Sequence, residues 1–248
     1  MTEWFRDAFG AHYLSLYAHR DEEEAAAMVD LIMRTVQPPP AARVLDAPCG
    51  AGRHTRQFAR RGLRPAGIDL SRDLLDAATE AQIAAGTDAQ YVRADLRTLP
   101  FPAGQFTVVA NLFSSFGYFI DEWENLQVVR ELIRVCVPGG HVVLDYMNEP
   151  FVRASLEPLT ERTTPDGWQV TERRMIGGQP PRVEKIITVR SDTGESRCVR
   201  ESVRLYTRQE LRNLLRDAGL TILYEFGDYG GGPWLTDSER LILIGCKR

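Results

Sequence analysis

Apolar residues in the first 36 positions follow a helical period. Large side chains three or four positions apart predict a first helix, and Ala25 to Val36 is expected to form a second. Pro38, Pro39 and Pro40 end the second helix, because a proline ring cannot continue it. The residues that set the first period are Phe5, Phe9, Tyr13, Leu16 and Tyr17.

Beyond the prolines, short apolar runs alternate with amphipathic stretches. Each run has the length of a strand, and Pro138-Gly139-Gly140 is expected to break the chain before the fifth. This alternation predicts a parallel sheet with helices on both faces. The expected strands are 43–46, 64–69, 89–93, 106–111 and 141–146, and the expected helices are 54–60, one capped by Ser71, and 122–136.

The pattern changes between residues 151 and 206. Stretches 168–174, 182–190 and 198–206 predict three strands, with Ser191 to Glu195 as a hairpin turn between the last two. Strands joined without helices pair antiparallel, so this segment is expected to form a small antiparallel insert.

Residues 207–248 return to the alternation of helix and strand and end with two consecutive strands. Thr207-Arg-Gln-Glu210 is a capping box that begins a helix, and Gly219 follows its end. Strands are expected at 221–226 and 240–246. The glycine-rich link between them has no helix, which fits an antiparallel pair.

Composition narrows the class of protein. The chain has 248 residues, 44% of them hydrophobic and 26% charged, which is typical of a globular protein and too apolar for a disordered one. No window approaches the roughly 18 apolar residues of a membrane span. The first residues lack the apolar core of a signal peptide, so a cytoplasmic location is expected. The cysteines never pair as C-x-x-C, and no metal site is predicted.

The densest chemical pattern is the turn after the first expected strand. Residues 44–55 read Val-Leu-Asp-Ala-Pro-Cys-Gly-Ala-Gly-Arg-His-Thr, a strand that enters a small-residue turn and then a helix. Small residues let the backbone approach a ligand, and the N–H groups of the helix point at it.

Polar residues mark the ends of the following strands. Asp69 comes 23 positions after Asp46, Asp95 follows the third strand, and Asn111 ends the fourth. Because the carboxyl ends of parallel strands share one edge, these residues predict a single ligand site. A carboxylate at Asp69 suits two ribose hydroxyls, and one at Asp95 suits an adenine amino group.

With these motifs in view, the chain resembles the class I S-adenosylmethionine-dependent methyltransferases. The resemblance covers roughly residues 40–147 and 207–248, including the closing antiparallel hairpin. It implies an α/β, Rossmann-like three-layer sandwich with a mostly parallel seven-stranded sheet, an antiparallel terminal strand and the small antiparallel β insert. The implied organisation is one domain over 1–248, with an N-terminal helical segment over 1–37 and the insert, 151–206, as a substrate lid.

The resemblance also implies roles for individual residues around S-adenosylmethionine. The turn from Asp46 to Gly52 would hold the methionyl part, Asp69 would bind the ribose, and Leu70 would pack on the adenine. Asp95 and the Leu96 amide would read the adenine edge, while Asn111 and Phe113 would flank the sulfonium. The full expected set is Asp46, Ala47, Pro48, Cys49, Gly50, Gly52, Asp69, Leu70, Asp95, Leu96, Asn111 and Phe113.

Pro48 departs from the family pattern, acid-x-Gly-x-Gly-x-Gly, which has glycine at that place. Proline has no N–H, so this position must contribute shape or a carbonyl. A nicotinamide dinucleotide-binding protein is an alternative that would also use an acid such as Asp69. That class expects Gly-x-Gly-x-x-Gly, and the residues after Gly52 do not supply the third glycine.

Catalytic residues are not fixed by the sequence. Methyl transfer gains much from holding donor and acceptor in line, and it needs a base only when the acceptor keeps its proton until late. His54, Tyr118 and Tyr146 are candidates, with packing roles as the alternative for each. The residues expected to contact the acceptor are Tyr13, Tyr17, His19, Tyr118, Tyr146 and Tyr229.

The acceptor is expected to be a small molecule. Residues 151–208 hold eleven basic and eight acidic side chains, which favours an anionic acceptor or nucleic acid, or else is an ordinary solvated face. Basic residues interleaved with aromatics, which would mark single-strand stacking, are missing. An RNA or protein methyltransferase and a non-catalytic S-adenosyl-ligand-binding protein stay open as alternatives. No membrane partner is expected, and the sequence does not fix the oligomeric state.

Overall fold

The structure, a computed structural model, describes residues 3–10, 22–164, 167–191 and 194–248. Helices and strands alternate from residue 22 to residue 147 and again after residue 206. The helices are α1 (Phe5–Ala8), α3 (Glu22–Val36), α4 (Arg53–Arg60), α5 (Arg72–Ala85), α6 (Glu122–Val135), α7 (Glu149–Ser155) and α8 (Arg208–Asp217). The strands are β1 (Arg43–Asp46), β2 (Arg64–Asp69), β3 (Gln90–Arg93), β4 (Phe106–Asn111), β5 (Cys136–Met147), β6 (Leu159–Thr163), β7 (Gln169–Gly177), β8 (Arg182–Arg190), β9 (Ser196–Arg204), β10 (Leu220–Phe226) and β11 (Arg240–Lys247).

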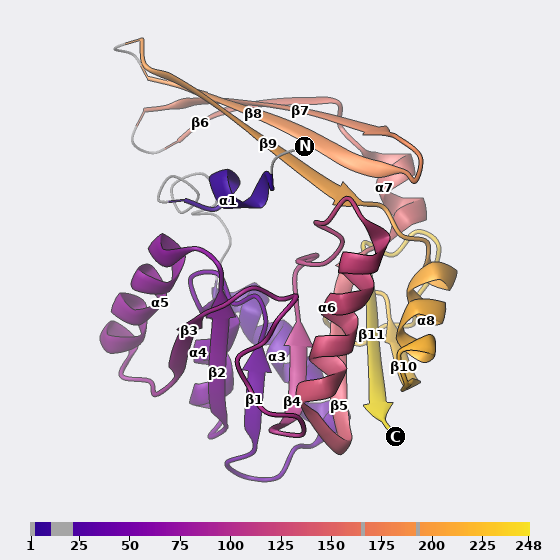
Figure 1. Cartoon of the computed structure of the whole chain (residues 1–248). Coiled ribbons are helices and arrows are strands. Elements are labelled where there is room, and N and C mark those ends of the chain that lie inside the picture. The colour runs from indigo at the N-terminus through magenta and orange to yellow at the C-terminus, as the bar shows by residue number, and fades with distance from the viewer. Residues whose placement is uncertain (1–2, 11–21, 165–166, 192–193) are drawn as a thin grey trace.

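Seven strands form one sheet in the order β10-β11-β5-β4-β1-β2-β3 (Figure 1). The pairs from β5 to β3 are parallel, and β11 runs antiparallel between β10 and β5. This confirms the mostly parallel seven-stranded sheet with an antiparallel terminal strand. The expected strands 43–46, 64–69 and 106–111 have the same bounds in the structure.

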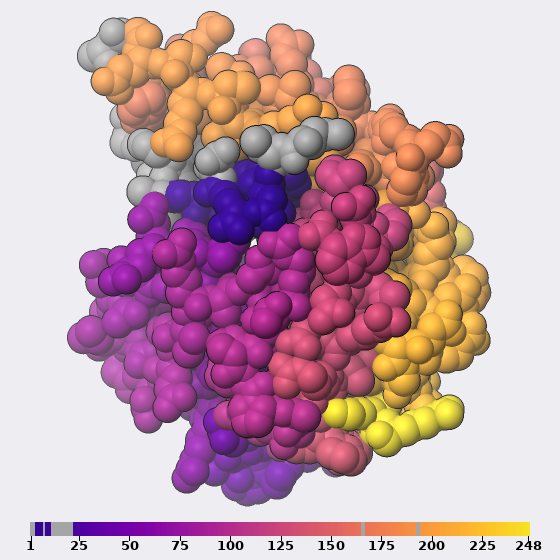
Figure 2. Space-filling model, viewed as in Figure 1, coloured from indigo at the N-terminus to yellow at the C-terminus, as the bar shows by residue number. Residues whose placement is uncertain are grey.

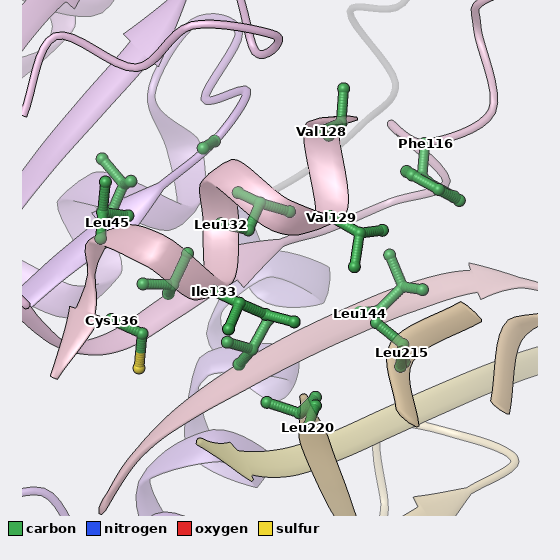
Figure 3. Packing of buried hydrophobic residues seen from close by; sticks show 14 of the residues in the cluster. Leu45, Phe116, Val128, Val129, Leu132, Ile133, Cys136, Leu144, Leu215 and Leu220 are labelled. Carbon is green, nitrogen blue, oxygen red and sulfur yellow. The ribbon is translucent and has the colours of Figure 1, made fainter. Parts of the chain in front are cut away.

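Successive residues of each central strand enter opposite faces of the sheet. In β1, Leu45 belongs to the same core cluster as residues of α6 and α8, whereas Val44 belongs to the cluster that contains residues of α3 and α4. Figure 3 shows the first of these layers, where Leu132 and Ile133 of α6 and Leu215 of α8 meet Leu144 of β5. The sheet is therefore covered on both faces, as the run of apolar strands predicts.

The N-termini of two helices carry the predicted caps. The Ser71 side chain accepts a hydrogen bond from the Leu74 N–H at the start of α5. At α8, Thr207 and Glu210 bond to each other's backbone N–H, which completes the capping box. The second N-terminal helix is confirmed but begins at Glu22, three residues earlier than expected.

The expected break at Pro138-Gly139-Gly140 is wrong. Strand β5 begins at Cys136, directly after α6, and continues through this tripeptide to Met147. Its register with β4 jumps from Cys136 opposite Phe106 to His141 opposite Val108, so the tripeptide lies in a bulge. A bulge tolerates the proline and the positive φ of Gly139, +76°, without ending the strand.

The antiparallel insert has one strand more than predicted. The sequence predicts three strands, and the structure adds β6 before them, giving a second sheet in the order β6-β7-β8-β9. None of the five residues of β6 is buried, and α7, also unexpected, buries none either. Such an edge strand leaves no apolar pattern in the sequence. Strands β8 and β9 pair antiparallel, and Ser191 N–H donates to the Glu195 carbonyl; residues 192–193 of the predicted turn lie outside the described residues.

The insert sheet lies across the carboxyl ends of the parallel strands, with α1 between the two layers (Figures 1 and 2). Helix α1 packs against β9 of the insert. The edge of the main sheet is thus bordered by three chain segments: the strand-end loops, α1 and the insert. No helix in the described ranges has both the length and the apolarity needed to cross a membrane.

Candidate functional site

A cavity of about 560 Å³ opens at the carboxyl edge of β1, β2 and β3. Its volume suits a nucleoside-sized ligand. The register pairs Asp46 of β1 with Gly67 of β2, and Asp69 of β2 with Arg93 of β3, so the predicted strand ends meet as expected. The predicted residues that line the cavity are Pro48, Cys49, Gly50, His54, Asp69, Leu70, Asp95, Leu96, Phe113 and Tyr118.

The turn after β1 is fixed by hydrogen bonds to neighbouring strands. Cys49 N–H donates to the Ile68 carbonyl at 2.7 Å, and Gly50 N–H donates to Asp69 Oδ2 at 2.9 Å. Gly52 has φ +74°, and a Cβ atom there would lie 2.3 Å from the Tyr91 hydroxyl. Only glycine meets both demands, and Gly52 then begins α4. Pro48, which follows a cis peptide bond, lies on the cavity wall and contributes shape, as the missing N–H requires.

Asp69 presents a carboxylate to this cavity and also holds the turn. Its two oxygens accept from the N–H groups of Gly50 and Ser71, both at 2.9 Å. Burial raises the pKa of Asp69, and these N–H donors oppose the rise by favouring the charged form. Each carboxylate oxygen has a second lone pair, so the side chain still has capacity for two hydroxyl donors.

Asp46 lies behind the turn. One oxygen, Oδ2, accepts from Thr55 Oγ1 at 2.6 Å, and the other has no partner among the described residues. Burial raises the pKa of Asp46 from 3.8 to about 7, and the nearby charge of Asp69 adds to the rise. Asp46, Ala47 and Gly52 do not line the cavity; they shape the backbone that does.

Asp95 is engaged by an arginine that the sequence did not indicate. Arg97 donates to both oxygens of Asp95, at 3.0 and 2.6 Å, and also to Glu3 at 2.6 Å. Burial raises the pKa of Asp95, but the hydrogen bonds from Arg97 outweigh it and leave the pKa lowered. Asp95 and Leu96 both line the cavity, where Leu70 and Leu96 give it apolar walls.

The loop after β4 forms the far wall of the cavity. Phe113 and Ser114 both have positive φ, +59° and +57°, and the buried carboxylate of Asp145 accepts from the Phe113 N–H at 2.8 Å. Arg240 pairs with Asp145 and reaches Ser114 Oγ at 3.1 Å. Asp145 lies near the end of an apolar strand, two residues before Met147, and this signal was available in the sequence.

Asn111 is not among the residues that line the first cavity, and its expected contact with the ligand stays a prediction. It is fully buried and donates to the Ala47 carbonyl at 2.8 Å, so it supports the first turn from behind. Tyr146 is also fully buried, and its hydroxyl donates to the Arg204 carbonyl. Tyr229 donates to Asp145 Oδ2 at 2.9 Å. Neither tyrosine lines either of these two cavities, so their expected acceptor contacts and the catalytic role of Tyr146 stay predictions.

His54 lines the first cavity, and its Nε2 atom has no partner among the described residues. Burial lowers its pKa well below 6.5, and the charges of Arg53, Arg240 and Arg56 lower it further. The imidazole is therefore neutral at pH 7 and a poor proton acceptor, but it offers a hydrogen bond to the polar end of a ligand. Tyr13, Tyr17 and His19 lie outside the described residues.

A second cavity of about 220 Å³ adjoins the first beneath the insert. Phe9, Phe113, Ser115 and Tyr118 line both cavities. The roof of the second comes from the insert, with Val183 and Lys185 of β8 and Glu201 and Val203 of β9. In the roof, Lys185 and Glu201 form an ion pair with a separation of 2.9 Å. Tyr118 is thus the predicted catalytic candidate that faces both spaces.

The residues that line the first cavity fit an adenosyl ligand. They provide a carboxylate at the end of β2, apolar walls from Leu70 and Leu96, and a close-packed turn. Residues 44–140 match the family model described as a methyltransferase domain. The chain is 27% identical over 205 residues to the cypemycin N-terminal methyltransferase of Streptomyces sp., a match that covers 81% of each chain.

By these matches the chain is similar to the S-adenosylmethionine-dependent methyltransferases. A crystal structure of a S-adenosylmethionine-dependent methyltransferase from Clostridium acetobutylicum superposes with a TM-score of 0.80 at 15% identity, covering 95% of this chain and 96% of that one. The match to the dTDP-3-amino-3,4,6-trideoxy-alpha-D-glucopyranose N,N-dimethyltransferase of Streptomyces venezuelae is 32% identical over 123 residues, 49% of this chain and 48% of the relative. The matched region therefore spans about half of that relative's length.

Asp69→Ala is expected to weaken binding of S-adenosylmethionine by about 1–3 kcal/mol, because ligand hydroxyls and the Gly50 and Ser71 N–H groups lose their acceptor. Calorimetric titration measures the affinity. Asp76→Ala, an exposed carboxylate on α5 paired with Arg72, is the matched control and should bind as the wild type does. An Asp69→Ala affinity equal to that of the control would contradict the ribose assignment.

The ligand-free protein is expected to lose stability as pH rises. With its pKa raised to about 7, folded Asp46 keeps a proton between about pH 4 and pH 7 that the unfolded chain has released. The stability that this proton contributes is fully present below pH 4 and is lost as the pH rises through the folded pKa of about 7. Relative to Asp46→Asn, the wild type should lose about 1–3 kcal/mol of unfolding free energy between pH 5 and pH 8. Urea unfolding at each pH measures both proteins. Parallel pH profiles of the wild type and Asp46→Asn would refute the raised pKa of Asp46.

Proposed function

We propose that this chain transfers a methyl group from S-adenosylmethionine to an amino nitrogen of a small molecule bound in the second cavity. The observation that carries the proposal is the shared wall of the two cavities, formed by Phe9, Phe113, Ser115 and Tyr118. An acceptor in the second cavity would face the end of the cofactor cavity at Phe113. Bound S-adenosylmethionine supplies an electrophilic methyl group on a sulfonium sulfur.

The chain's own residues would act mainly by positioning. Phe113, Tyr118 and Phe9 present aromatic surface where the two cavities meet, which would exclude water and hold the acceptor in line with the methyl group. Asp145 and Arg240 hold the strained Phe113–Ser114 backbone in place. A neutral amine already carries the lone pair that attacks, so no base is required before the methyl group moves. As the N–C bond forms the S–C bond breaks, S-adenosylhomocysteine leaves, and the methylated ammonium then releases its proton to water.

Two features support nitrogen as the acceptor atom. Glu201 brings a carboxylate into the roof of the second cavity beside Lys185, where it would accept hydrogen bonds from the N–H groups of an amine. Two of the relatives are named for N-terminal methylation and for N,N-dimethylation of an amino sugar. The insert, with its antiparallel strands over the sheet edge, would serve as the substrate lid of a single-domain enzyme.

A peptide with a free N-terminus is the second candidate acceptor, favoured by the similarity to the cypemycin enzyme over 81% of the chain. A small amino sugar fits the 220 Å³ cavity better than a folded protein or an RNA, which would need an open groove. A protein that binds S-adenosylmethionine without transferring it would give no methylated product with either probe. The same assay therefore separates all three functions.

We expect methyl transfer from labelled S-adenosylmethionine to dTDP-3-amino-3,4,6-trideoxy-glucose, with a short peptide carrying a free N-terminus as the second probe. Val203→Trp, which fills the second cavity from β9, should raise KM for the acceptor at least about tenfold, since a side chain would occupy its place. Binding of S-adenosylhomocysteine should stay unchanged, because Val203 does not line the first cavity.

Met175→Trp is the control, since Met175 is an exposed residue of β7 in the same insert. It should leave KM and product formation unchanged. If the Val203→Trp variant transferred the methyl group as fast as the wild type, the second cavity would not be the acceptor site. Absence of product with every amine would contradict the proposed reaction.

A further inference from the structure

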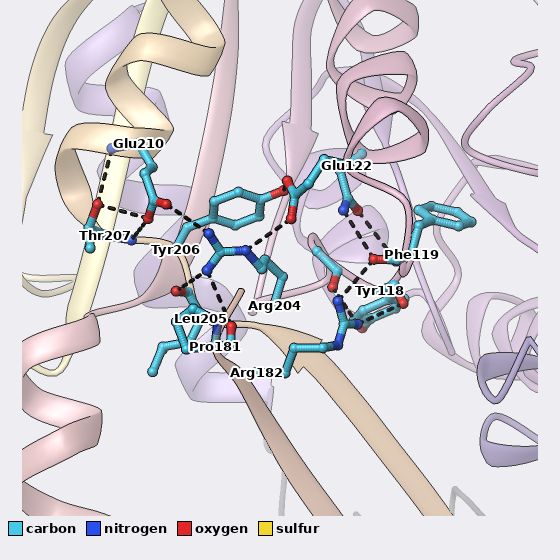
Figure 4. Close-up of polar contacts among 12 residues, drawn as sticks. Tyr118, Phe119, Glu122, Pro181, Arg182, Arg204, Leu205, Tyr206, Thr207 and Glu210 are labelled. Carbon is cyan, nitrogen blue, oxygen red and sulfur yellow. Dashed lines mark hydrogen bonds and ion pairs between the residues drawn. The ribbon is translucent and has the colours of Figure 1, made fainter. Parts of the chain in front are cut away.

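The loop between β4 and α6 carries Tyr118, and an arginine of the insert binds its backbone. Arg182, the first residue of β8, donates to three consecutive carbonyls of this loop, those of Gly117, Tyr118 and Phe119, at 3.1, 3.0 and 3.0 Å (Figure 4). These residues are more than 60 positions away in the sequence. The insert and the cofactor-proximal loop therefore meet through one side chain.

The guanidinium is itself held in a fixed orientation. Its Nε and one Nη donate to the hydroxyl and the carbonyl of Ser202 on β9, at 2.7 and 2.8 Å. Arg182 is buried, with 7% of its surface exposed. The planar guanidinium bonds to Ser202 of the insert on one side and to the loop on the other. The position of the insert sheet therefore fixes that of the loop.

Backbone contacts reinforce the same junction. Arg204 N–H of β9 donates to the Gly117 carbonyl at 2.8 Å. Gly117 has φ +83°, and a Cβ atom at this residue would lie 3.2 Å from the Arg204 Cβ and 3.3 Å from its carbonyl oxygen. The loop thus packs against β9 as closely as glycine allows, and the contact leaves little freedom for Tyr118 to shift.

The base of the insert is anchored to the helices of the main domain beside this contact. Arg204 pairs with Glu122 of α6 at 2.9 Å and with Glu210 of α8 at 2.7 Å (Figure 4). The Tyr206 hydroxyl donates to Glu122 at 2.5 Å. Because α6, α8 and the insert share these groups, the insert has a defined position from which Arg182 can act.

The carbonyls that Arg182 binds also accept from other groups. Tyr118 O accepts from Trp4 Nε1 at 3.2 Å, and Phe119 O accepts from Asn125 Nδ2 at 3.1 Å. The ring of Tyr118 packs against Trp4, Phe5 and Phe9, with ring centroids 5.1 to 6.5 Å apart. A shift of the loop would therefore move the aromatic wall between the two cavities.

We propose that Arg182 is a positioning residue for methyl transfer: it ties the insert to carbonyls 117–119 and so sets the place of Tyr118 between the donor and acceptor cavities. This inference rests on the proposed function, since it takes the second cavity as the acceptor site. Arg182 touches neither cavity; it acts through the loop. The insert is then part of the active-site geometry as well as a cover.

The test compares Arg182→Met and Arg182→Lys with Arg173→Met, which removes an exposed arginine of β7 from the same sheet. Arg182→Met should lower kcat roughly tenfold to a hundredfold, the usual effect of a small misplacement of reacting groups, while S-adenosylhomocysteine affinity changes about twofold or less. Arg182→Lys keeps the charge but not the planar fork, so it should recover stability without recovering kcat. Arg173→Met should behave as the wild type does.

A spectroscopic measurement reports the loop without any acceptor. The Trp4 indole N–H donates to the Tyr118 carbonyl, so its ¹H–¹⁵N resonance should shift in Arg182→Met and Arg182→Lys but not in Arg173→Met. Trp4→Phe assigns that resonance among those of the four tryptophans.

The two sets of results separate the inference from the proposed function. An unchanged Trp4 resonance in a folded Arg182→Met protein overturns the inference. If the wild type forms product, an unchanged kcat in Arg182→Met overturns it as well. If the wild type methylates neither probe, the proposed function fails, and the resonance alone decides whether Arg182 sets the loop. If Arg182→Met does not fold, the same readings are taken on Arg182→Lys.

Discussion

The hydrogen bond from the Gly50 N–H to the Asp69 carboxylate is the contact on which the site depends. It joins the turn after β1 to the end of β2 at 2.9 Å, and a second bond from Ser71 N–H fixes the other oxygen. The two turns that line the first cavity are therefore placed by one side chain. The parallel register of β1 with β2 puts that side chain at the sheet edge where both turns begin.

The other elements position what faces this edge. Asp145 and Arg240 hold the loop after β4 at Phe113, and Arg182 holds the same loop further on at residues 117–119. One loop thus receives constraints from the main sheet and from the insert. Its aromatic residues then separate a cavity that suits an adenosyl ligand from a smaller one beneath the insert.

Features that depend on neighbouring residues were predictable from the sequence. Three strands have the predicted bounds because each is a buried apolar run between turn residues, and the Ser71 and Thr207 caps act within three residues. The turn residues Pro48, Cys49 and Gly50, which line the first cavity, stand out for the same reason. In contrast, β6 buries no residue and left no pattern, and a bulge let β5 pass through Pro138.

Features set by distant packing were not predictable. Asn111, Tyr146 and Tyr229 stand at the predicted edge, but their side chains bond to backbone carbonyls or to Asp145, and none of the three lines either of the two cavities. Arg97 and Arg182 were missed because Glu3 and the loop carbonyls that they bind lie 63 to 94 positions away. The direction of a side chain depends on such partners, and a strand pattern does not contain them.

The most direct test of this account is a crystal structure of the chain with S-adenosylhomocysteine. The account predicts the ribose hydroxyls at Asp69, the adenine between Leu70 and Leu96, and the sulfur at Phe113, facing the second cavity. A ligand whose sulfur points away from the wall formed by Phe113 and Tyr118, or one bound outside the first cavity, would contradict it.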